Sequence, residues 1–435
     1  MVLACASFAG ASATLFLEEP YGKMGFFTAT GHAAVYLSGV CADSPLTLRR
    51  CAPGETGVVL SRYDGVGGYD WVAIPLIPYL YAVERAEDIP LVANAKMAAF
   101  LRDRYRRKYL EEIVPDGKDG EIPGGNWYQL VGSSYDRSIF GFEIETTAEQ
   151  DEALIQKFNT SPNRSHFHLA SRNCADFAKD VFNFYYPKSL HRSIGADLGM
   201  TTPKQMAKML ARFSDHHPEL KSSRLVIAQV PGSMPRSTHV HGVVESFLKS
   251  KKYIVPSVLV SPIFAGSVAA AYVTTGAGHF EPARNAMVFV AGSDPQPPLD
   301  REDLRAYRGE LKHFLSDAYP ESRRNVEKQW ARLQSKTQTG VDEQGRPVLQ
   351  MQLEESLVQI GVAPGNILNG SAPQFARQLL EARLQSELHD KSPQGISEVE
   401  VIRDWELLQK TVGSSDSRLT ARSGQRSENV RRNRP

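Results

Sequence analysis

The residues best suited to covalent chemistry are one cysteine and one histidine that lie far apart in the chain. Cys174 falls at the start of a helix-like segment whose apolar residues share one stripe: Phe177, Val181 and Phe184. The unpaired N–H groups and positive dipole end of a helix N-terminus favour a thiolate, so we expect a lowered pKa for Cys174. A nucleophilic cysteine also needs a base, and His32, which opens a strand-like run, is the best candidate. The alternative is a buried structural cysteine, with His32 completing a turn.

These two residues must be positioned by a mixture of strands and helices. Strand-like runs occupy 14–17, 33–37, 57–63 and 142–145. Helix-like segments occupy 92–112, a stretch through Phe158 that opens on a capping box in 146–150, 174–184, and a stretch that opens on Thr202 and Pro203. The pattern predicts an α+β domain over residues 14–215.

The spacing of the chemical residues resembles a known family. Gly31-His32 leads one strand, a second strand follows, and Asn173-Cys174-x-x-Phe177 comes more than a hundred residues later. This order resembles the circularly permuted branch of the NlpC-type papain-like fold, which includes the lecithin-retinol acyltransferase-like enzymes. The segment 15–25 followed by Gly31-His32 is also similar to the opening of exported bacterial domains of uncertain function in this group.

The resemblance implies a permuted papain-like N-terminal domain, with a small antiparallel sheet packed on helices. It implies a cysteine-dependent hydrolase or acyltransferase that forms an acyl-enzyme on Cys174, with His32 as general base. An oxyanion would be met by the Cys174 backbone N–H. The substrate would be an amide or ester, from a cell-envelope peptide or an acyl lipid, and no cofactor is implied.

The family usually places a third polar residue on the strand after the histidine, where it orients the imidazole. Here the strand over 57–63 offers Ser61 and Tyr63 but no His, Asn, Asp or Gln. Ser61 is the candidate orienting residue, and Asp70 is an alternative. This departure supports a second hypothesis, a non-catalytic envelope domain that binds a ligand through the same groove and uses its C-terminal helices for assembly.

The remaining cysteines bear on localisation. Cys41 and Cys51 are separated by nine residues that join two strand candidates, so a disulfide between them is plausible in an oxidising compartment. The alternative is two unrelated buried cysteines. Residues 1–13 are small and apolar and end in the small-x-small pattern Ala11-Ser12-Ala13, although no basic residue precedes Lys23. We expect an export signal there, and the alternative is a buried N-terminal segment.

Residues 253–275 form an apolar stretch without a charged residue, just after three lysines: Lys249, Lys251 and Lys252. Its length suits a transmembrane helix, and its flanking lysines suit a membrane interface. The prolines at 256 and 262 and the valine-rich composition favour the alternative, a pair of buried strands. The sequence therefore predicts either a membrane segment or a buried apolar segment.

The other parts of the chain carry no motif with a chemical mechanism. Residues 216–252 are a connecting segment, 276–412 are a mainly helical accessory region with one hairpin-like stretch at 342–347, and 413–435 are a disordered basic tail.

The composition excludes several classes of function. Lys plus Arg (50) nearly cancels Asp plus Glu (49), so we expect no nucleic-acid partner. The histidine groupings lack the spacing of metal ligands, and the glycine-rich run 64–68 lacks the lysine of a phosphate loop, so no metal site or cofactor is predicted. The expected partners are a peptide or acyl substrate and a membrane.

Overall fold

The computed structural model describes residues 11–21, 30–164, 166–193, 197, 199–274, 280–318, 328, 331, 335–353, 356–367, 373–389 and 395–412. The contacts divide the chain into two compact units: unit 1 comprises residues 1–86, 94–230 and 234–298, and unit 2 comprises 87–93, 231–233 and 299–435. Residues 1–10 of the predicted leader and the predicted basic tail from 413 lie outside the described residues.

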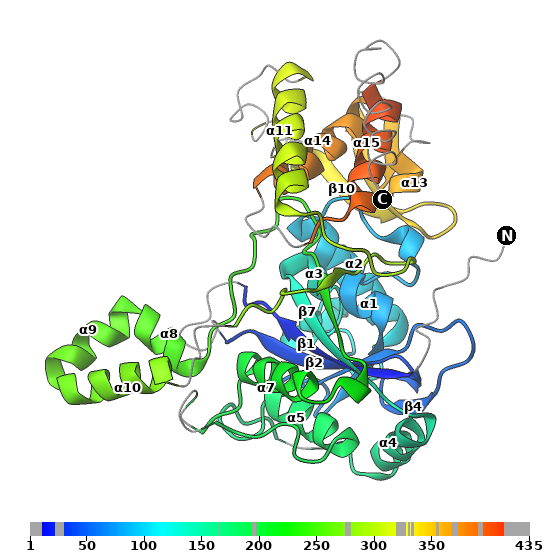
Figure 1. The fold of residues 1–435 in the computed structure, drawn as a ribbon. Coiled ribbons are helices and arrows are strands. Elements are labelled where there is room, and N and C mark those ends of the chain that lie inside the picture. The colour runs from blue at the N-terminus through cyan, green and yellow to red at the C-terminus, as the bar shows by residue number, and fades with distance from the viewer. Residues whose placement is uncertain are drawn as a thin grey trace. The chain divides into compact units, whose positions relative to one another are not determined.

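Unit 1 is built on a seven-stranded mixed sheet in the order β6-β5-β2-β1-β7-β8-β9 (Figure 1). Its strands are β1 (Ser12–Glu18), β2 (His32–Leu37), β5 (Val58–Ser61), β6 (Val72–Pro75), β7 (Ile139–Glu145), β8 (Ser223–Ile227) and β9 (Met287–Val288). Neighbouring strands pair antiparallel except β8 and β9, which pair parallel. The four runs expected to be strands do form strands. The sheet is larger than the expected small antiparallel sheet, and it is mixed rather than purely antiparallel. Two further strands come from beyond residue 215, because β8 pairs with β7 and β9 pairs with β8.

The alternation of β1 and β2 divides the sheet into two faces. The side chains of Leu15, Leu17 and Ala33 enter the main core, which is covered by α4 (Ala148–Thr160), α5 (Cys174–Tyr185) and α7 (Pro203–Asp215). The side chains of Phe16, Glu18 and His32 leave the sheet on the opposite face. On that face Phe16 packs against Tyr79 of α1 (Leu76–Tyr81). Figure 1 shows helices on both sides of the sheet.

The remaining elements of this unit are shorter or lie outside the sheet. They are β3 (Val40–Ser44), β4 (Thr47–Arg50), α2 (Ala95–Tyr109), α3 (Ser133–Asp136), and the 3-10 turns η2 (Ala86–Asp88), η3 (Lys118–Gly120), η4 (Asn126–Gln129) and η5 (Pro218–Leu220), with η2 ending across the boundary into unit 2. The helix starts follow their predicted caps. Thr147 forms a capping box with Gln150 at α4, and the Thr202 side chain accepts from the Gln205 N–H at α7.

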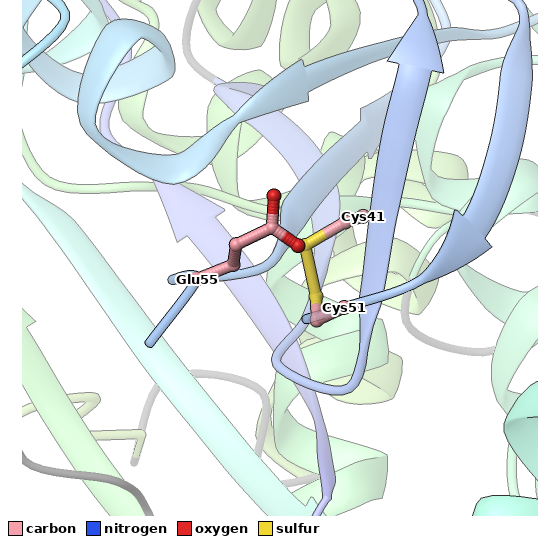
Figure 2. A group of neighbouring side chains, drawn as sticks. All are labelled: Cys41, Cys51 and Glu55. Atoms are coloured by element: carbon pink, nitrogen blue, oxygen red, sulfur yellow. A yellow bond between two sulfur atoms is a disulfide. The ribbon is translucent and has the colours of Figure 1, made fainter. Parts of the chain in front are cut away.

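A disulfide joins Cys41 to Cys51, as the sequence indicated (Figure 2). The nine residues between them form their own hairpin, in which Cys41 of β3 pairs with Arg49 of β4. Glu55 lies beside the disulfide, and its carboxylate accepts bonds from Arg49 and from the Ala52 N–H. Arg49 holds the pKa of Glu55 at about 2. The two sulfurs and this carboxylate lie within 4.8 Å of one another. The sulfurs are joined covalently and the carboxylate is held by Arg49, so their close approach has a structural explanation.

The apolar stretch after Lys252 is helical, so the expected pair of buried strands is wrong. It forms α9 (Lys251–Val260) and α10 (Pro262–Thr274), which pack with α8 (Val243–Lys249). Ser261 separates the two helices and Pro262 opens the second, because proline is favoured in the first turn of a helix. No described helix has the length and apolarity to cross a bilayer.

Unit 2 combines a three-stranded antiparallel sheet with helices. Its elements are β10 (Thr337–Val341), β11 (Pro347–Leu353), β12 (Ser356–Gly361), α11 (Arg301–Ala318), α13 (Pro364–Ile367), α14 (Pro373–His389) and α15 (Glu398–Val412). The predicted hairpin at 342–347 joins β10 to β11, and β12 extends it. Buried Arg383 of α14 contacts Glu387 at 2.9 Å and Asp404 of α15 at 3.0 Å. This network links the two helices.

Candidate active site

Cys174 is the first residue of α5, and Asn173 caps the helix. The Asn173 side-chain oxygen accepts from the N–H groups of Ala175 and Asp176, at 2.9 and 3.0 Å. Its amide nitrogen donates to the carbonyls of Leu169 and Thr201, at 2.8 and 3.0 Å. Asn173 is therefore buried and fully engaged, and it fixes the direction in which the helix, and with it Cys174, meets the sheet.

The Cys174 thiol is not activated by its helix, contrary to the sequence expectation. Burial raises its pKa to about 11, and the charge of Glu18 acts in the same direction. The backbone N–H groups of Ala33, Ala175 and Cys174 oppose this shift in the pKa by stabilising the thiolate. The loss of solvation has a larger effect on the pKa than the helix N-terminus, because a thiolate in apolar surroundings loses more hydration free energy than its hydrogen bonds to these N–H groups restore. The resting side chain is a neutral thiol.

His32 is the first residue of β2 and lies opposite Glu18 of β1 in the strand register. Its ring stacks on the ring of Tyr63, with centroids 4.1 Å apart and planes 9° from parallel. Burial, together with the positive charge of Arg137, lowers the pKa of His32 well below its ordinary value. The imidazole is therefore neutral, and its Nε2 has no hydrogen-bond partner among the described residues.

Gly31 determines how the chain enters this strand. Its φ is +69°, and a Cβ there would lie 2.2 Å from the Glu18 carbonyl oxygen. Only glycine tolerates both the left-handed conformation and this close approach. The residue places the chain against β1 immediately before His32.

Ser61 and Asp70, the two candidates for the orienting residue, have different surroundings. Ser61 is buried and pairs with Ala34 of β2, so its side chain leaves the sheet on the same face as that of His32. Its hydroxyl has no hydrogen-bond partner among the described residues. Asp70 instead forms ion pairs with Arg62 at 2.7 Å and with Arg172 at 2.9 Å.

Arg62 links this second carboxylate to α5. Its guanidinium lies 5.0 Å from the centroid of the Phe177 ring and donates to the Asn173 carbonyl at 3.3 Å. Asp70 therefore holds Arg62 in contact with the first turn of α5. This is a structural contact, made on the face of the sheet opposite to the His32 ring.

A buried charged cluster beside His32 was missed by sequence reasoning. Glu18 is fully buried, accepts a hydrogen bond from the Tyr79 hydroxyl, and lies 3.1 Å from Arg137. Burial raises the pKa of Glu18, while Arg137 and Tyr79 oppose the rise. The guanidinium of Arg137 also lies 4.4 Å from the centroid of the Tyr21 ring. A glutamate that closes an apolar strand was the one signal in the sequence, and its partner is more than a hundred residues away.

The structure brings Cys174 and His32 to adjacent points of β2. The helix bearing the thiol packs on one face of the sheet, and the thiol meets the Ala33 backbone N–H, one residue beyond His32. The His32 ring leaves the sheet toward Glu18 and Tyr63. The described residues show no hydrogen bond between the two side chains. The two side chains thus approach the same end of β2 from opposite faces of the sheet, and Ser61 is two residues from the stacking partner of the imidazole.

Comparisons with known proteins return no match: no family model, no curated protein and no solved structure is similar to this chain.

Proposed function

We propose that unit 1 is a cysteine-dependent hydrolase or acyltransferase of the permuted papain-like kind, acting on an amide or ester through an acyl-enzyme on Cys174. The observation that carries the proposal is the position of Cys174, at the first turn of a capped helix and against the backbone of the residue that follows His32. A nucleophile at a helix start and a histidine from a neighbouring strand are the two parts that thiol acyl transfer requires.

The two groups begin the reaction in their neutral forms. The thiol has a pKa of about 11 and the imidazole has a lowered pKa, so no thiolate–imidazolium pair exists at rest. In the structure the imidazole leaves β2 on the face of the sheet opposite to α5, so the proposed step requires the His32 side chain to turn toward the thiol at the end of the strand. The imidazole then takes the thiol proton as sulfur bonds to the carbonyl carbon and the C=O electron pair moves to oxygen. In this proposal the Cys174 backbone N–H donates to that oxyanion. The imidazolium then protonates the leaving amine or alcohol, and water or an acceptor cleaves the thioester to restore the thiol.

His32 is oriented in this proposal by stacking rather than by a polar third residue. Tyr63 fixes the plane of the ring. Glu18 is the residue of β1 that pairs with His32, so the two side chains leave the sheet on the same face. The sequence hypothesis of an orienting hydroxyl at Ser61 stays a prediction.

The Cys41–Cys51 disulfide supports an oxidising location, because such bonds form and persist outside reducing compartments. We therefore propose an exported or envelope-associated enzyme, with a cell-envelope peptide or an acyl lipid as the substrate.

Ser12 and Ala13 are the first two residues of β1, so cleavage after Ala13 would remove paired residues from the centre of the sheet.

The second candidate is a non-catalytic binding domain, favoured by the neutral, partly buried thiol and by the lack of a hydrogen bond between it and His32 in the described structure. Acylation by a p-nitrophenyl ester separates the two, read as acyl mass on the peptide that contains Cys174. A Cys5→Ser background leaves Cys174 as the one cysteine outside the disulfide. We expect a burst of p-nitrophenol and acylated Cys174, both absent in Cys174→Ser. If the folded protein gives neither, the binding domain is the better account.

A further inference from the structure

The helical hairpin formed by α9 and α10 exposes an aliphatic tip to solvent. We define the apolar tip as Val258, Leu259, Val260 and Ile263, at the turn between the two helices. Their exposed fractions are 47% for Val258, 79% for Leu259, 86% for Val260 and 82% for Ile263. Leaving such side chains in water forfeits much of the free energy of burying them, so an exposed cluster of this kind marks an interaction site.

The apolar tip is exposed on all sides of the helix rather than along one stripe. Val258, Leu259 and Val260 are consecutive, and consecutive residues project about 100° apart around a helix. A protein partner that docks on one face would leave at least one of them in water. A fluid apolar phase surrounds a protruding tip completely, so the geometry favours lipid over a folded partner.

The lengths of α9 and α10 also favour a lipid environment for the apolar tip. The two helices contain 10 and 13 residues. Apolar helices of about 10–14 residues are typically buried in a core or lie at a membrane interface. Among the side chains of α9 and α10 that the structure describes, the buried ones are Ala265 and Val268 of α10. The exposed part of the hairpin has the length and composition of an interfacial element.

The charges near the hairpin complement an anionic surface. Lys249 is paired with Glu245 of α8 at 2.6 Å. Residues 250–280 contain Lys251 and Lys252 and no Asp or Glu, and both lysines are exposed at the start of α9. Val260 lies eight residues beyond Lys252, a rise of about 12 Å along a helix. Interfacial helices sink about 5–10 Å into the boundary between headgroups and acyl chains. Lysines at this height would lie among lipid phosphates while the tip reaches the acyl chains.

We propose that the α9–α10 hairpin inserts its apolar tip into one leaflet of a bilayer that contains anionic lipid, with Lys251 and Lys252 at the headgroups. The hairpin anchors the protein at the surface of the membrane. The proposal is independent of the chemistry at Cys174, so a Cys174→Ser protein binds membranes as the wild type does.

Co-flotation of the full chain with phosphatidylcholine vesicles, with and without phosphatidylglycerol, tests this. Leu259→Asp/Ile263→Asp removes two side chains from the lipid, and we expect the partition coefficient to fall about a hundredfold or more. Lys251→Gln/Lys252→Gln lowers binding about thirtyfold on phosphatidylglycerol vesicles and leaves it unchanged on pure phosphatidylcholine. All of these positions are exposed, so we expect the variants to stay folded, and their melting temperatures check this.

The matched control is Ile122→Asp/Ile402→Asp, which adds the same two charges at isoleucines that are 56% and 49% exposed elsewhere. It should float with vesicles as the wild type does. The proposal is overturned if the wild-type chain does not float with either vesicle, or if the tip variant floats as well as the control. It is also overturned if light scattering without lipid shows a dimer that only the tip variant dissociates, because a second copy would then cover the tip.

Discussion

The ring of His32 lies parallel to the ring of Tyr63, with centroids 4.1 Å apart and planes 9° from parallel. Stacking on an aromatic ring restricts the imidazole without using either of its nitrogens, so Nε2 stays available to exchange a proton. The proposed mechanism needs an imidazole nitrogen that is free to accept a proton, because the thiol on α5 begins as a neutral group.

The first prediction concerns the reactivity of Cys174 toward iodoacetamide, which requires a thiolate. With a pKa of about 11, the thiolate fraction at neutral pH is about 10⁻⁴. The folded protein should therefore be alkylated more slowly than a free cysteine peptide, and the rate should rise with pH up to about pH 11. Labelling is followed by mass spectrometry on the Cys5→Ser protein. A plateau between pH 7 and 9 would show an activated thiolate and refute the neutral pair.

The second prediction concerns Glu18 and the pH dependence of stability. Burial raises the pKa of Glu18 above its ordinary value of 4.5, so the folded state holds this proton more tightly than the unfolded chain. Its contribution to the free energy of unfolding is fully present below pH 4.5 and is lost as the pH rises through the folded pKa. In urea unfolding, the difference between wild type and Glu18→Gln should therefore move against the wild type as the pH rises from acid to neutral.

Glu55 provides the control of opposite sign. Arg49 lowers the pKa of Glu55 to about 2, so its contribution is present above the ordinary pKa and is lost as the pH falls toward 2. Glu55→Gln should thus lose stability relative to wild type on the neutral side and not on the acidic side. Parallel pH profiles for the two variants would contradict the assignment of Glu18 as a buried carboxyl with a raised pKa.

The third prediction concerns the cap of the helix that carries Cys174. Asn173→Ala removes two bonds to helix N–H groups and two bonds to carbonyls, and we expect a loss of about 3 kcal/mol in the free energy of unfolding. Thr147→Ala, which removes an exposed cap from α4, should cost about 1 kcal/mol. Equal losses in denaturant unfolding would mean that Asn173 does not anchor α5 as described.

The fourth prediction concerns the disulfide. The Cys41–Cys51 bond closes a loop with a sequence separation of 10, for which chain entropy predicts a contribution of about 2–3 kcal/mol. Cys41→Ser/Cys51→Ser should lower the free energy of unfolding by that amount and leave the rate of Cys174 acylation unchanged. An effect on acylation would show that the β3–β4 hairpin, which packs on β5 and β6, influences the site through the sheet.

Local patterns in the sequence predicted the helices and strands that carry the site. They did not predict the contacts between residues that are far apart in the chain. The capping box at Thr147 and the strand that begins at His32 depend on neighbouring residues, so the sequence predicted both. The capping box at Asn173 is equally local but was not predicted. The ion pair of Glu18 with Arg137 could not be read in this way, because strand register and packing bring the two residues together. The pKa of Cys174 was predicted in the wrong direction, because the sequence shows the helix start but not the burial.

The apolar stretch after Lys252 shows the same division. Its composition predicted an apolar segment. The break at Ser261 and the exposure of Val260 depend on how the two short helices pack with α8. The mixed sheet was underestimated for a related reason. β9 has only two residues, and so short a strand leaves no periodic pattern to detect.

The central claim is that His32 takes the proton of the Cys174 thiol during acyl transfer. The most direct measurement is the rate at which a p-nitrophenyl ester acylates Cys174, compared between the wild type, His32→Ala and a free cysteine peptide at neutral pH. We predict that the wild type reacts faster than the peptide and that His32→Ala lowers the rate by about a hundredfold or more. A wild type that reacts no faster than the peptide, with a rate unchanged in His32→Ala, would contradict the account.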